Sequence, residues 1–197
     1  MTFEDIITDL ITAIGDNPER DGVKDTPRRV VKMYKELFRG YDPTQHPTIT
    51  TFLNGSDGLV YDEMIIDSGS FTSHCEHHMM PFTGQYWFAY VPHPKGNIIG
   101  LSKVARVVDY CSARLQVQER LTTEIVDTIA KALQRRTAGE MTCEIFDPLG
   151  VALVMRASHT CKSMRGVKKD GLMTTSCLRG VFKDKPEARE EFMRLIR

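Results

Sequence analysis

The run FTSHCEHHMMPF, residues 71–82, carries side chains of the kinds that bind soft or borderline metal ions. It places Cys75 beside three of the six histidines of the chain. Cys75 and His78 are three residues apart, and in a helical turn or a tight loop this spacing points both side chains at one centre. Two ligands do not hold zinc tightly, so the pattern predicts a further ligand from another segment.

A second segment with such side chains is SHTCKSMRG, residues 158–166, in which Cys161 follows His159 by two. On an extended segment residues i and i+2 share a face, so we expect His159 to look toward whatever Cys161 binds. Cys75, His78 and Cys161 would give Zn²⁺ three ligands and leave one tetrahedral position for water, the arrangement of a catalytic zinc. Water in that position becomes acidic enough to supply hydroxide near pH 7.

The three remaining cysteines leave an alternative open. A structural zinc site with four protein ligands would use similar residues, and Cys143 or Cys177 could supply the fourth. A lone cysteine is more often a small buried apolar side chain, and this is what we expect of Cys111, Cys143 and Cys177.

Several basic residues lie near the starts of predicted helices, and this pattern predicts an anion-binding site. Three polar or basic residues stand in GLSKVAR, with the first as the expected helix cap: Ser102, Lys103 and Arg106. Free backbone N–H groups and the helix dipole favour phosphate at such a place. Arg165 follows Cys161 closely, and Arg29 and Lys32 lie on a predicted helix near the N-terminus. A solvated basic face is the alternative for each of these groups.

Gln118 and Glu119 open another predicted helix. A carboxylate beside an amide suits a ligand with adjacent N–H donors, such as the N1–H and 2-amino groups of guanine. Most glutamates on helices face water, so this pair gains weight only together with the other motifs.

Two amphipathic helices are predicted before the main body. The first covers residues 3–14, and its apolar residues recur at helical spacing: Ile6, Leu10 and Ile14. The second begins near Asp25 and ends near Gly40. The loop YDPTQHPTI follows, and we divide the chain there into a helical N-terminal extension, residues 1–48, and a main domain, residues 49–197.

The main domain is predicted to follow the order strand–strand–helix–helix–strand–strand, with a last short helix. The predicted strands are residues 59–75, 84–92, 141–148 and 150–159, and the predicted helices are residues 101–115, 117–133 and 185–197. Residues 164–171 are read as a polar loop.

Composition excludes several classes of function. Lys+Arg and Asp+Glu both number 26, so no global field favours nucleic acid or an anionic membrane. No apolar stretch approaches the roughly 20 residues of a membrane span, and the acidic N-terminus does not resemble a targeting signal. We therefore expect a cytoplasmic protein whose five cysteines form no disulfide framework.

Five motifs occur together in one order: DTPRRVVKMY, SHCEHHMMPFTGQ, IIGLSKVARVVDYCSARLQVQERLT, GVALVMRASHTCKSMRGV and TTSCLRGVF. From about residue 13 onward the chain strongly resembles type I (IA) GTP cyclohydrolase. The resemblance implies an α+β tunnelling fold (T-fold), an antiparallel four-stranded sheet with two helices on one side. It also implies a homodecamer of two pentameric barrels, with active sites between subunits.

The resemblance also implies roles for residues. The zinc ligands would be Cys75, His78 and Cys161, and the proton-transferring histidines His77 and His159. Glu119 would anchor the guanine, with Gln118 beside it near the ribose. The triphosphate would meet Ser102, Lys103, Arg106, Arg165 and Lys32, with Arg29 at a further basic position. Glu76 matches a family position whose role the sequence does not reveal.

The implied reaction converts GTP and water into 7,8-dihydroneopterin triphosphate and formate, a first step toward folate, pterin or 7-deazaguanine compounds. Two alternatives remain at this level. One is another enzyme of pterin or deazapurine metabolism on the same fold, and the other is a non-catalytic protein with structural zinc.

Overall fold

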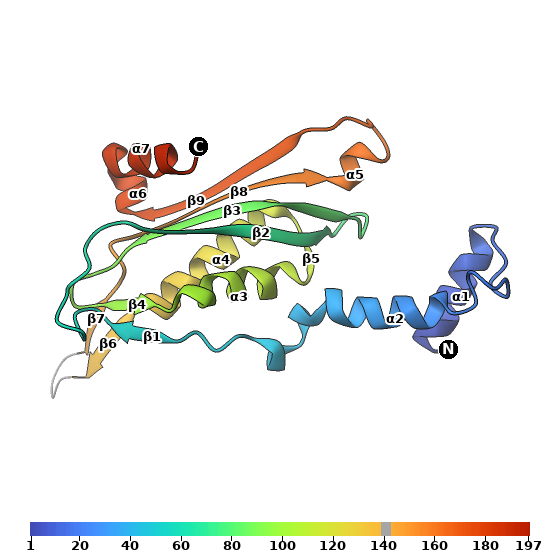
Figure 1. Ribbon diagram of the computed structural model, residues 1–197, viewed down its shortest axis with the longest axis horizontal. Helices are drawn as coiled ribbons and strands as arrows, with labels where there is room; N and C mark the ends of the chain where they lie inside the picture. Colours follow the sequence, from blue (N-terminus) through green and yellow to red (C-terminus); the bar gives the residue numbers. More distant parts are fainter. Residues whose placement is uncertain (139–142) are drawn as a thin grey trace.

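The computed structural model describes residues 1–138 and 143–197 and has one long, twisted sheet at its centre (Figure 1). The strand order of this sheet is β5-β2-β3-β8-β9. Its four long strands are antiparallel: β2 (Ile65–Cys75), β3 (Pro81–Val91), β8 (Gly150–His159) and β9 (Leu172–Gly180). A two-residue strand, β5 (Leu115–Gln116), joins the edge of β2 in the parallel sense.

The centre of the sheet is built from apolar residues on both faces. Strand β8 is buried along most of its length, as expected for a strand covered on two sides. Gly84 of β3 lies opposite Ala157 of β8, and a Cβ atom at Gly84 would come within 1.8 Å of the Arg156 carbonyl oxygen. The close approach of β3 and β8 therefore requires glycine at this position.

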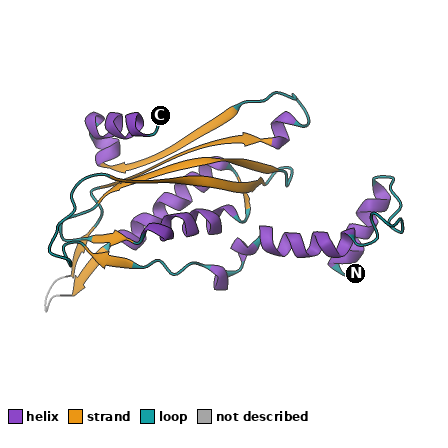
Figure 2. Cartoon of the chain, viewed as in Figure 1, coloured by secondary structure: helices purple, strands orange, loops and turns teal. Residues whose placement is uncertain are grey.

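Two helices cover one face of the sheet, α3 (Leu101–Ser112) and α4 (Gln118–Leu133) (Figure 2). The row predicted for α4 is buried: Leu121, Ile125, Ile129 and Leu133. Val104, Val107 and Val108 of α3 pack into the same core. Gly100, and not Ser102, is the N-cap of α3, so Ser102 lies in the first turn and not at the cap as predicted.

The other face is covered at one end by α6 (Val181–Asp184) and α7 (Pro186–Leu195). Phe182, Phe192 and Ile196 pack there against Ala152 and Val154 of β8. The predicted terminal helix is thereby confirmed.

Two strand predictions need correction. The strand predicted from Leu59 begins at Ile65. The strand predicted for residues 141–148 is β7 (Cys143–Phe146), which pairs with β6 (Arg135–Ala138) in a separate hairpin; Met141 and Thr142 lie outside the described residues. The fourth long strand is β9, which the sequence reading did not assign. A further two-stranded sheet joins β1 (Thr51–Leu53) to β4 (Asn97–Ile99).

The N-terminal region forms an arm that extends from one end of the sheet (Figure 1). It contains α1 (Phe3–Ala13), α2 (Thr26–Leu37) and two short 3-10 helices, η1 (Arg39–Tyr41) and η2 (Pro43–Gln45). Thr2 caps α1 and accepts the Asp5 backbone N–H at 3.1 Å. A small core in the arm contains Ile7, Ile11 and Val23.

The apolar row predicted for α1 faces outward. The exposed fractions are 45% for Ile6, 54% for Leu10 and 74% for Ile14, because α1 turns the adjacent row toward α2. Among the described residues, no helix is long and apolar enough to cross a lipid bilayer. The domain boundary at residue 48 stays a prediction.

Candidate metal centre and substrate site

Cys75, His78 and Cys161 come together at the end of the sheet nearest the arm. Their ligand atoms all lie within 4.8 Å of one another, and Cys75 Sγ is 4.0 Å from His78 Nδ1. Two sulfurs and one imidazole are donors that zinc prefers, so the residues fit this ion. Burial raises the pKa of the Cys161 thiol, and the nearby Cys75 sulfur raises it further, a cost that a bound cation would offset.

Neither Cys143 nor Cys177 joins this group within the part of the chain that the structure describes. Cys177 is buried in β9 and Cys111 in α3, as predicted. Cys143 is exposed in the β6–β7 hairpin, so the prediction of a buried thiol there is wrong.

The first two candidate ligands, Cys75 and His78, are held by a tight turn between β2 and β3. The Cys75 backbone N–H donates to the Met80 carbonyl at 2.8 Å, and the Met79 N–H donates to the Cys75 carbonyl at 2.8 Å. Met79 has a φ of 57°, a left-handed conformation that closes the turn. The Glu76 N–H donates to the Gln116 carbonyl of β5 at 3.0 Å, which fastens the turn to the edge of the sheet.

Cys161 reaches the same place from the far end of β8. His159 is the last residue of β8, and the chain then enters the short helix α5 (Thr160–Ser163). Thr160 donates its hydroxyl to the Pro81 carbonyl at 2.6 Å, which fixes α5 beside the start of β3. The expected extended spacing of His159 and Cys161 is therefore wrong, because the backbone turns into a helix between them.

His159 is held between Phe82 and Gln118. The imidazole stacks on the Phe82 ring at 4.4 Å with an interplanar angle of 5°, and its Nε2 lies 2.8 Å from Gln118 Oε1. The Gln118 amide nitrogen donates to the carbonyls of Met155 and Met173 and to the hydroxyl of Thr175. The amide oxygen must therefore face the imidazole, which places the proton on Nε2 and leaves Nδ1 as an acceptor.

Burial lowers the pKa of His159 below its ordinary value, so the imidazole is neutral near pH 7. A neutral imidazole with a free Nδ1 can accept a proton. Gln118 itself is 1% exposed and has its amide fully engaged, so it acts on His159 from within the core. Its predicted place near a ribose stays a prediction.

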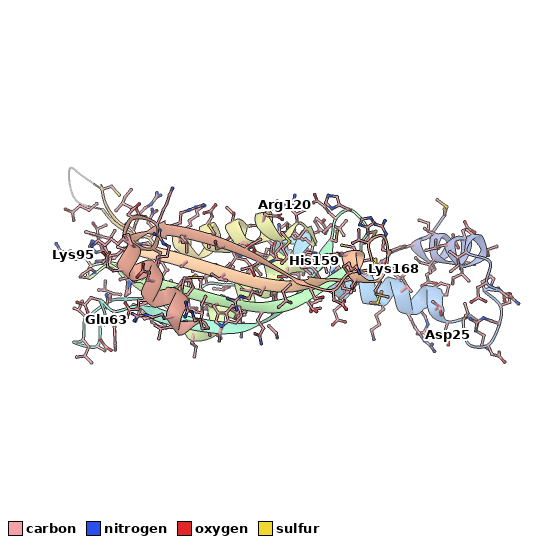
Figure 3. The ribbon with its side chains drawn as sticks, turned by 90° about the horizontal axis from the view of Figure 1, so that it is seen from above. Asp25, Glu63, Lys95, Arg120, His159 and Lys168 are labelled. Atoms are coloured by element: carbon pink, nitrogen blue, oxygen red, sulfur yellow. The ribbon has the colours of Figure 1, made fainter. Side chains whose placement is uncertain are left out.

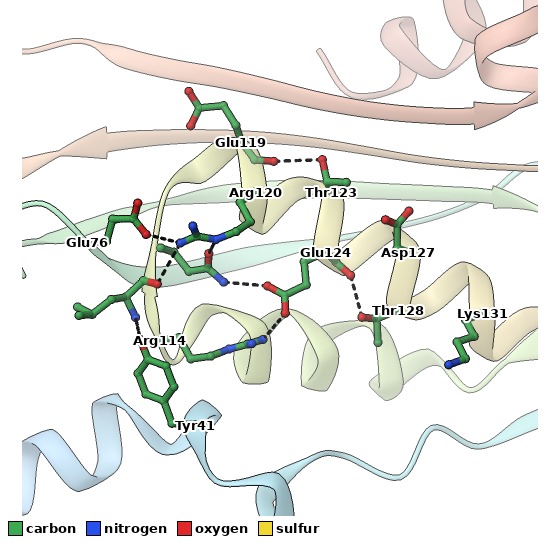
Figure 4. Close-up of a pocket in the computed structure, with 12 residues that line it drawn as sticks. Tyr41, Glu76, Arg114, Glu119, Arg120, Thr123, Glu124, Asp127, Thr128 and Lys131 are labelled. Atoms are coloured by element: carbon green, nitrogen blue, oxygen red, sulfur yellow. Dashed lines mark hydrogen bonds and ion pairs between the residues drawn. The ribbon is translucent and has the colours of Figure 1, made fainter.

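The other candidate residues at this end differ in exposure. His77 is exposed, with Nδ1 3.6 Å from Cys75 Sγ. Glu119 is exposed on the first turn of α4, and its charge acts on His159. Figure 4 shows the Glu119 carboxylate pointing away from the neighbouring Arg120.

Two cavities adjoin these residues. One, of about 1130 Å³, is lined by residues that include Glu76, Glu119 and Arg120. The other, of about 450 Å³, is lined by His159 and Cys161 among others. Glu119 and Glu76 therefore border the first cavity, while His159 and Cys161 border the second.

One chain does not bring the predicted phosphate-binding residues together. Arg165 lies against His78 Nε2, at the metal-binding end. Figure 3 places Arg120 and His159 at that end and Lys95 at the opposite end of the sheet. Three of the predicted phosphate-binding residues lie in the first turns of α3, beside the beginning of β2 and not at its Cys75 end: Ser102, Lys103 and Arg106. Arg29 and Lys32 lie on the arm, where Arg29 pairs with Asp25 at 3.3 Å.

Sequence reasoning missed a polar network behind the metal-binding turn. Arg120 forms an ion pair with Glu76 and donates from Nε to Gln116 Oε1 at 2.9 Å. Arg120 comes two residues into α4 after Gln118, and an arginine at a helix start, where the dipole disfavours cations, is a signal that it has a specific partner.

Comparisons with known proteins agree on one family. The family model described as GTP cyclohydrolase I matches residues 3–197. GTP cyclohydrolase 1 of Caldanaerobacter subterraneus subsp. tengcongensis is 44% identical over 191 residues, covering 96% of this chain and 93% of that protein. The corresponding proteins of Dehalococcoides mccartyi (strain ATCC BAA-2266) and Rhodopirellula baltica are 42% and 40% identical, covering 96% and 98% of this chain and 93% and 77% of their own lengths. Because these matches span nearly the whole chain, it belongs to the GTP cyclohydrolase I family.

Proposed function

We propose that this chain hydrolyses the imidazole ring of the guanine in GTP and yields formate and 7,8-dihydroneopterin triphosphate. One observation supports this above the others: two thiols and an imidazole converge beside a neutral histidine whose Nδ1 is free to accept a proton. The family match gives the substrate, and the side chains supply the means of proton transfer.

Cys75, His78 and Cys161 would hold zinc. When bound by three protein ligands, zinc supplies the Lewis acidity that makes water a nucleophile near neutral pH, which purine C8 requires because it is a poor electrophile. With three protein ligands, the fourth position on the zinc would stay available to water.

His159 would move the proton at purine N7 as the ring opens. Its Nδ1 can accept a proton while Gln118 keeps Nε2 in place, and the Phe82 ring limits rotation of the imidazole. His77, exposed beside Cys75, is the second candidate for proton transfer. Glu119 would accept the N1–H and 2-amino protons of guanine and so orient the base.

The triphosphate would meet basic residues from more than one chain. Ser102, Lys103 and Arg106 lie in the first turns of α3, which border the beginning of β2, whereas Cys75 is the last residue of β2. A complete site would therefore need a second copy that presents the first turns of its α3. This separation supports the proposal of a homodecamer, two stacked pentamers with sites between subunits. We also propose a cytoplasmic location.

The alternative of a structural zinc protein is less well supported. A structural site takes four protein ligands, whereas three cluster in the described residues. Another enzyme on the same fold would differ in its products, so product analysis separates the two enzymatic alternatives.

The direct test is to incubate the zinc-loaded protein with GTP and to measure formate and pterin fluorescence. We expect both products in equal amounts, and we expect a chelator to abolish them and added zinc to restore them. Protein that contains zinc and binds GTP but releases neither product would contradict the proposed reaction.

Cys161→Ser is the matched variant, since it removes one donor and keeps the size of the side chain. We expect it to lose stoichiometric zinc together with activity. Cys177→Ser is the control and should keep its zinc, because Cys177 lies outside the ligand group. Full zinc occupancy in Cys161→Ser would remove Cys161 from the site.

A further inference from the structure

Arg120 connects three segments of the chain at the wall of the larger cavity (Figure 4). Its Nε donates to Gln116 Oε1 at 2.9 Å, and its Nη2 donates to the Leu115 carbonyl at 3.3 Å. The same Nη2 forms an ion pair with the Glu76 carboxylate. One guanidinium on α4 thus binds both strand β5 and the turn that carries the metal ligands.

Glu76 stands between Cys75 and His77, and its carboxylate is directed to Arg120. The hydrogen bond from Arg120 lowers the pKa of Glu76, so the carboxylate is charged at neutral pH. The Glu76 backbone N–H is bonded to Gln116 as well. The turn is therefore fastened by both its backbone and a side chain to the segment that leads into α4.

The partners of Arg120 are themselves fixed. Gln116 is 2% exposed, and its amide nitrogen donates to the Cys111 carbonyl at 3.1 Å and to Glu124 at 2.9 Å. Glu124 in turn accepts from Arg114 at 2.7 Å. The network joins the last turn of α3 to the second turn of α4, so Arg120 binds the metal-binding turn to a rigid base.

We propose that Arg120 is a positioning residue for the metal site. By holding Glu76, Arg120 keeps the turn of residues 75–78 at a fixed position relative to the first turn of α4. Glu119, the neighbour of Arg120 in the sequence, lies on that same helical turn. The metal ligands and the carboxylate proposed to orient guanine then keep one spacing. This inference rests on the proposed zinc-dependent function.

The ion pair between Arg120 and Glu76 is expected to fix the position of the turn of residues 75–78 more than to raise the free energy of unfolding. The Arg120 side chain is 50% exposed and that of Glu76 is 34% exposed, so solvent screens their attraction. The guanidinium is nevertheless fixed in direction, because its Nε donates to Gln116 while its Nη2 donates to Glu76. Outer groups that orient metal ligands affect metal affinity strongly.

The experiment uses the zinc-loaded full chain and measures the rate of zinc transfer to a chromophoric chelator, together with kcat and KM for GTP. For Arg120→Met we expect zinc loss to be about tenfold faster and kcat to fall about tenfold. KM should change less than about twofold, since Arg120 is not proposed to touch GTP. Glu76→Gln should reproduce these changes, and the double variant should be no worse than either single one.

Arg179→Met is the control. Arg179 lies on β9 and pairs at 3.3 Å with Asp127 of α4, the helix that also carries Arg120. Its side chain is 47% exposed, close to the value for Arg120. It should keep the zinc-loss rate of the original chain. Arg120→Lys keeps the charge but cannot donate from two guanidinium nitrogens to Gln116 and Glu76, so it should give an intermediate rate of zinc loss. If Arg120→Met does not fold, Glu76→Gln decides, because it leaves the bonds of Arg120 to β5 in place.

Two results would overturn the inference. One is an unchanged zinc-loss rate in folded Arg120→Met or Glu76→Gln, and the other is a rise in KM alone, which would make Arg120 a substrate contact. Failure of the original chain to hold zinc or to release formate would instead contradict the proposed function, so the two failures are distinguishable.

Discussion

Gln118 and Glu119 are adjacent in sequence but have opposite surroundings. Successive residues of an α-helix point about 100° apart, so Gln118 joins the buried row of Leu121 and Ile125 while Glu119 reaches the surface. Helical periodicity could have revealed the burial of Gln118, but its polar type suggested a ligand contact instead. The convergence of Cys75, His78 and Cys161 could be predicted, because few residue types bind zinc, and their role as zinc ligands stays a prediction.

Gln118→Leu is predicted to destabilise the fold and to free His159. The substitution removes the acceptor of the imidazole N–H and takes the Gln118 donor away from the carbonyls of Met155 and Met173, so we expect a loss of about 2 kcal/mol in the free energy of unfolding. Urea denaturation of the metal-loaded protein measures it.

Lys131→Ala on the exposed side of α4 is the control for this change and should alter the free energy of unfolding by less than about 0.5 kcal/mol. Equal stability of Gln118→Leu and the original chain would show that the amide network does not contribute.

At the scale of elements, the strands and helices with strong periodicity were predicted and the polar strand was not. Strand β9 has the sequence LMTTSCLRG, in which short polar residues replace the β-branched aliphatic pattern. Its partner β8 supplies most of the apolar residues of the pair. The strand conformation of β9 therefore depends on pairing with β8 more than on the residue types of β9 itself. Ile145 and Phe146 of β7 made this segment resemble a core strand, although β7 pairs only with β6 in the described structure.

Gly84→Ala is predicted to disrupt the pairing of β3 with β8. The added Cβ would meet the Arg156 carbonyl oxygen at 1.8 Å, and backbone atoms cannot move aside without separating the strands. We expect a loss of about 3 kcal/mol in stability, and faster zinc loss because the same strand pair places Phe82 opposite His159. Thermal unfolding and chelator transfer measure the two effects.

Gly100→Ala serves as the comparison, since its Cβ would have no neighbour nearer than 3.6 Å. Its cost should stay below about 1 kcal/mol. A Gly84→Ala protein as stable as Gly100→Ala would contradict the argument from close strand approach.

At the scale of the molecule, the arm exposes an apolar surface that its own chain does not cover. Several of its apolar side chains are exposed: Phe3, Ile6, Leu10, Ile14 and Met33. Exposed apolar surface of this kind marks contacts with other chains. The sequence showed the arm and its helices but not which row would face outward, because this depends on how α1 meets α2.

Light scattering is predicted to give a particle of ten chains, each of 22.4 kDa. The start of α3 and Cys75 lie at different ends of β2, so a complete site would need more than one chain. The number ten is that of the proposed homodecamer. A monomeric protein with full activity would contradict the proposed assembly.

The first turns of α3 lie beside the beginning of β2, whereas Cys75 is the last residue of β2, and this placement has a consequence for how activity responds to dilution. In the proposed site, each chain would supply all three candidate metal ligands, which cluster within 4.8 Å, but only some of the residues proposed to bind the triphosphate. Chains separated at very low concentration would keep their zinc and stop turning over GTP. Specific activity would then fall as the protein is diluted, while the zinc content per chain stayed constant. Mixing an inactive variant that lacks a metal ligand with an inactive variant that lacks a phosphate-binding residue of α3 would restore some complete sites.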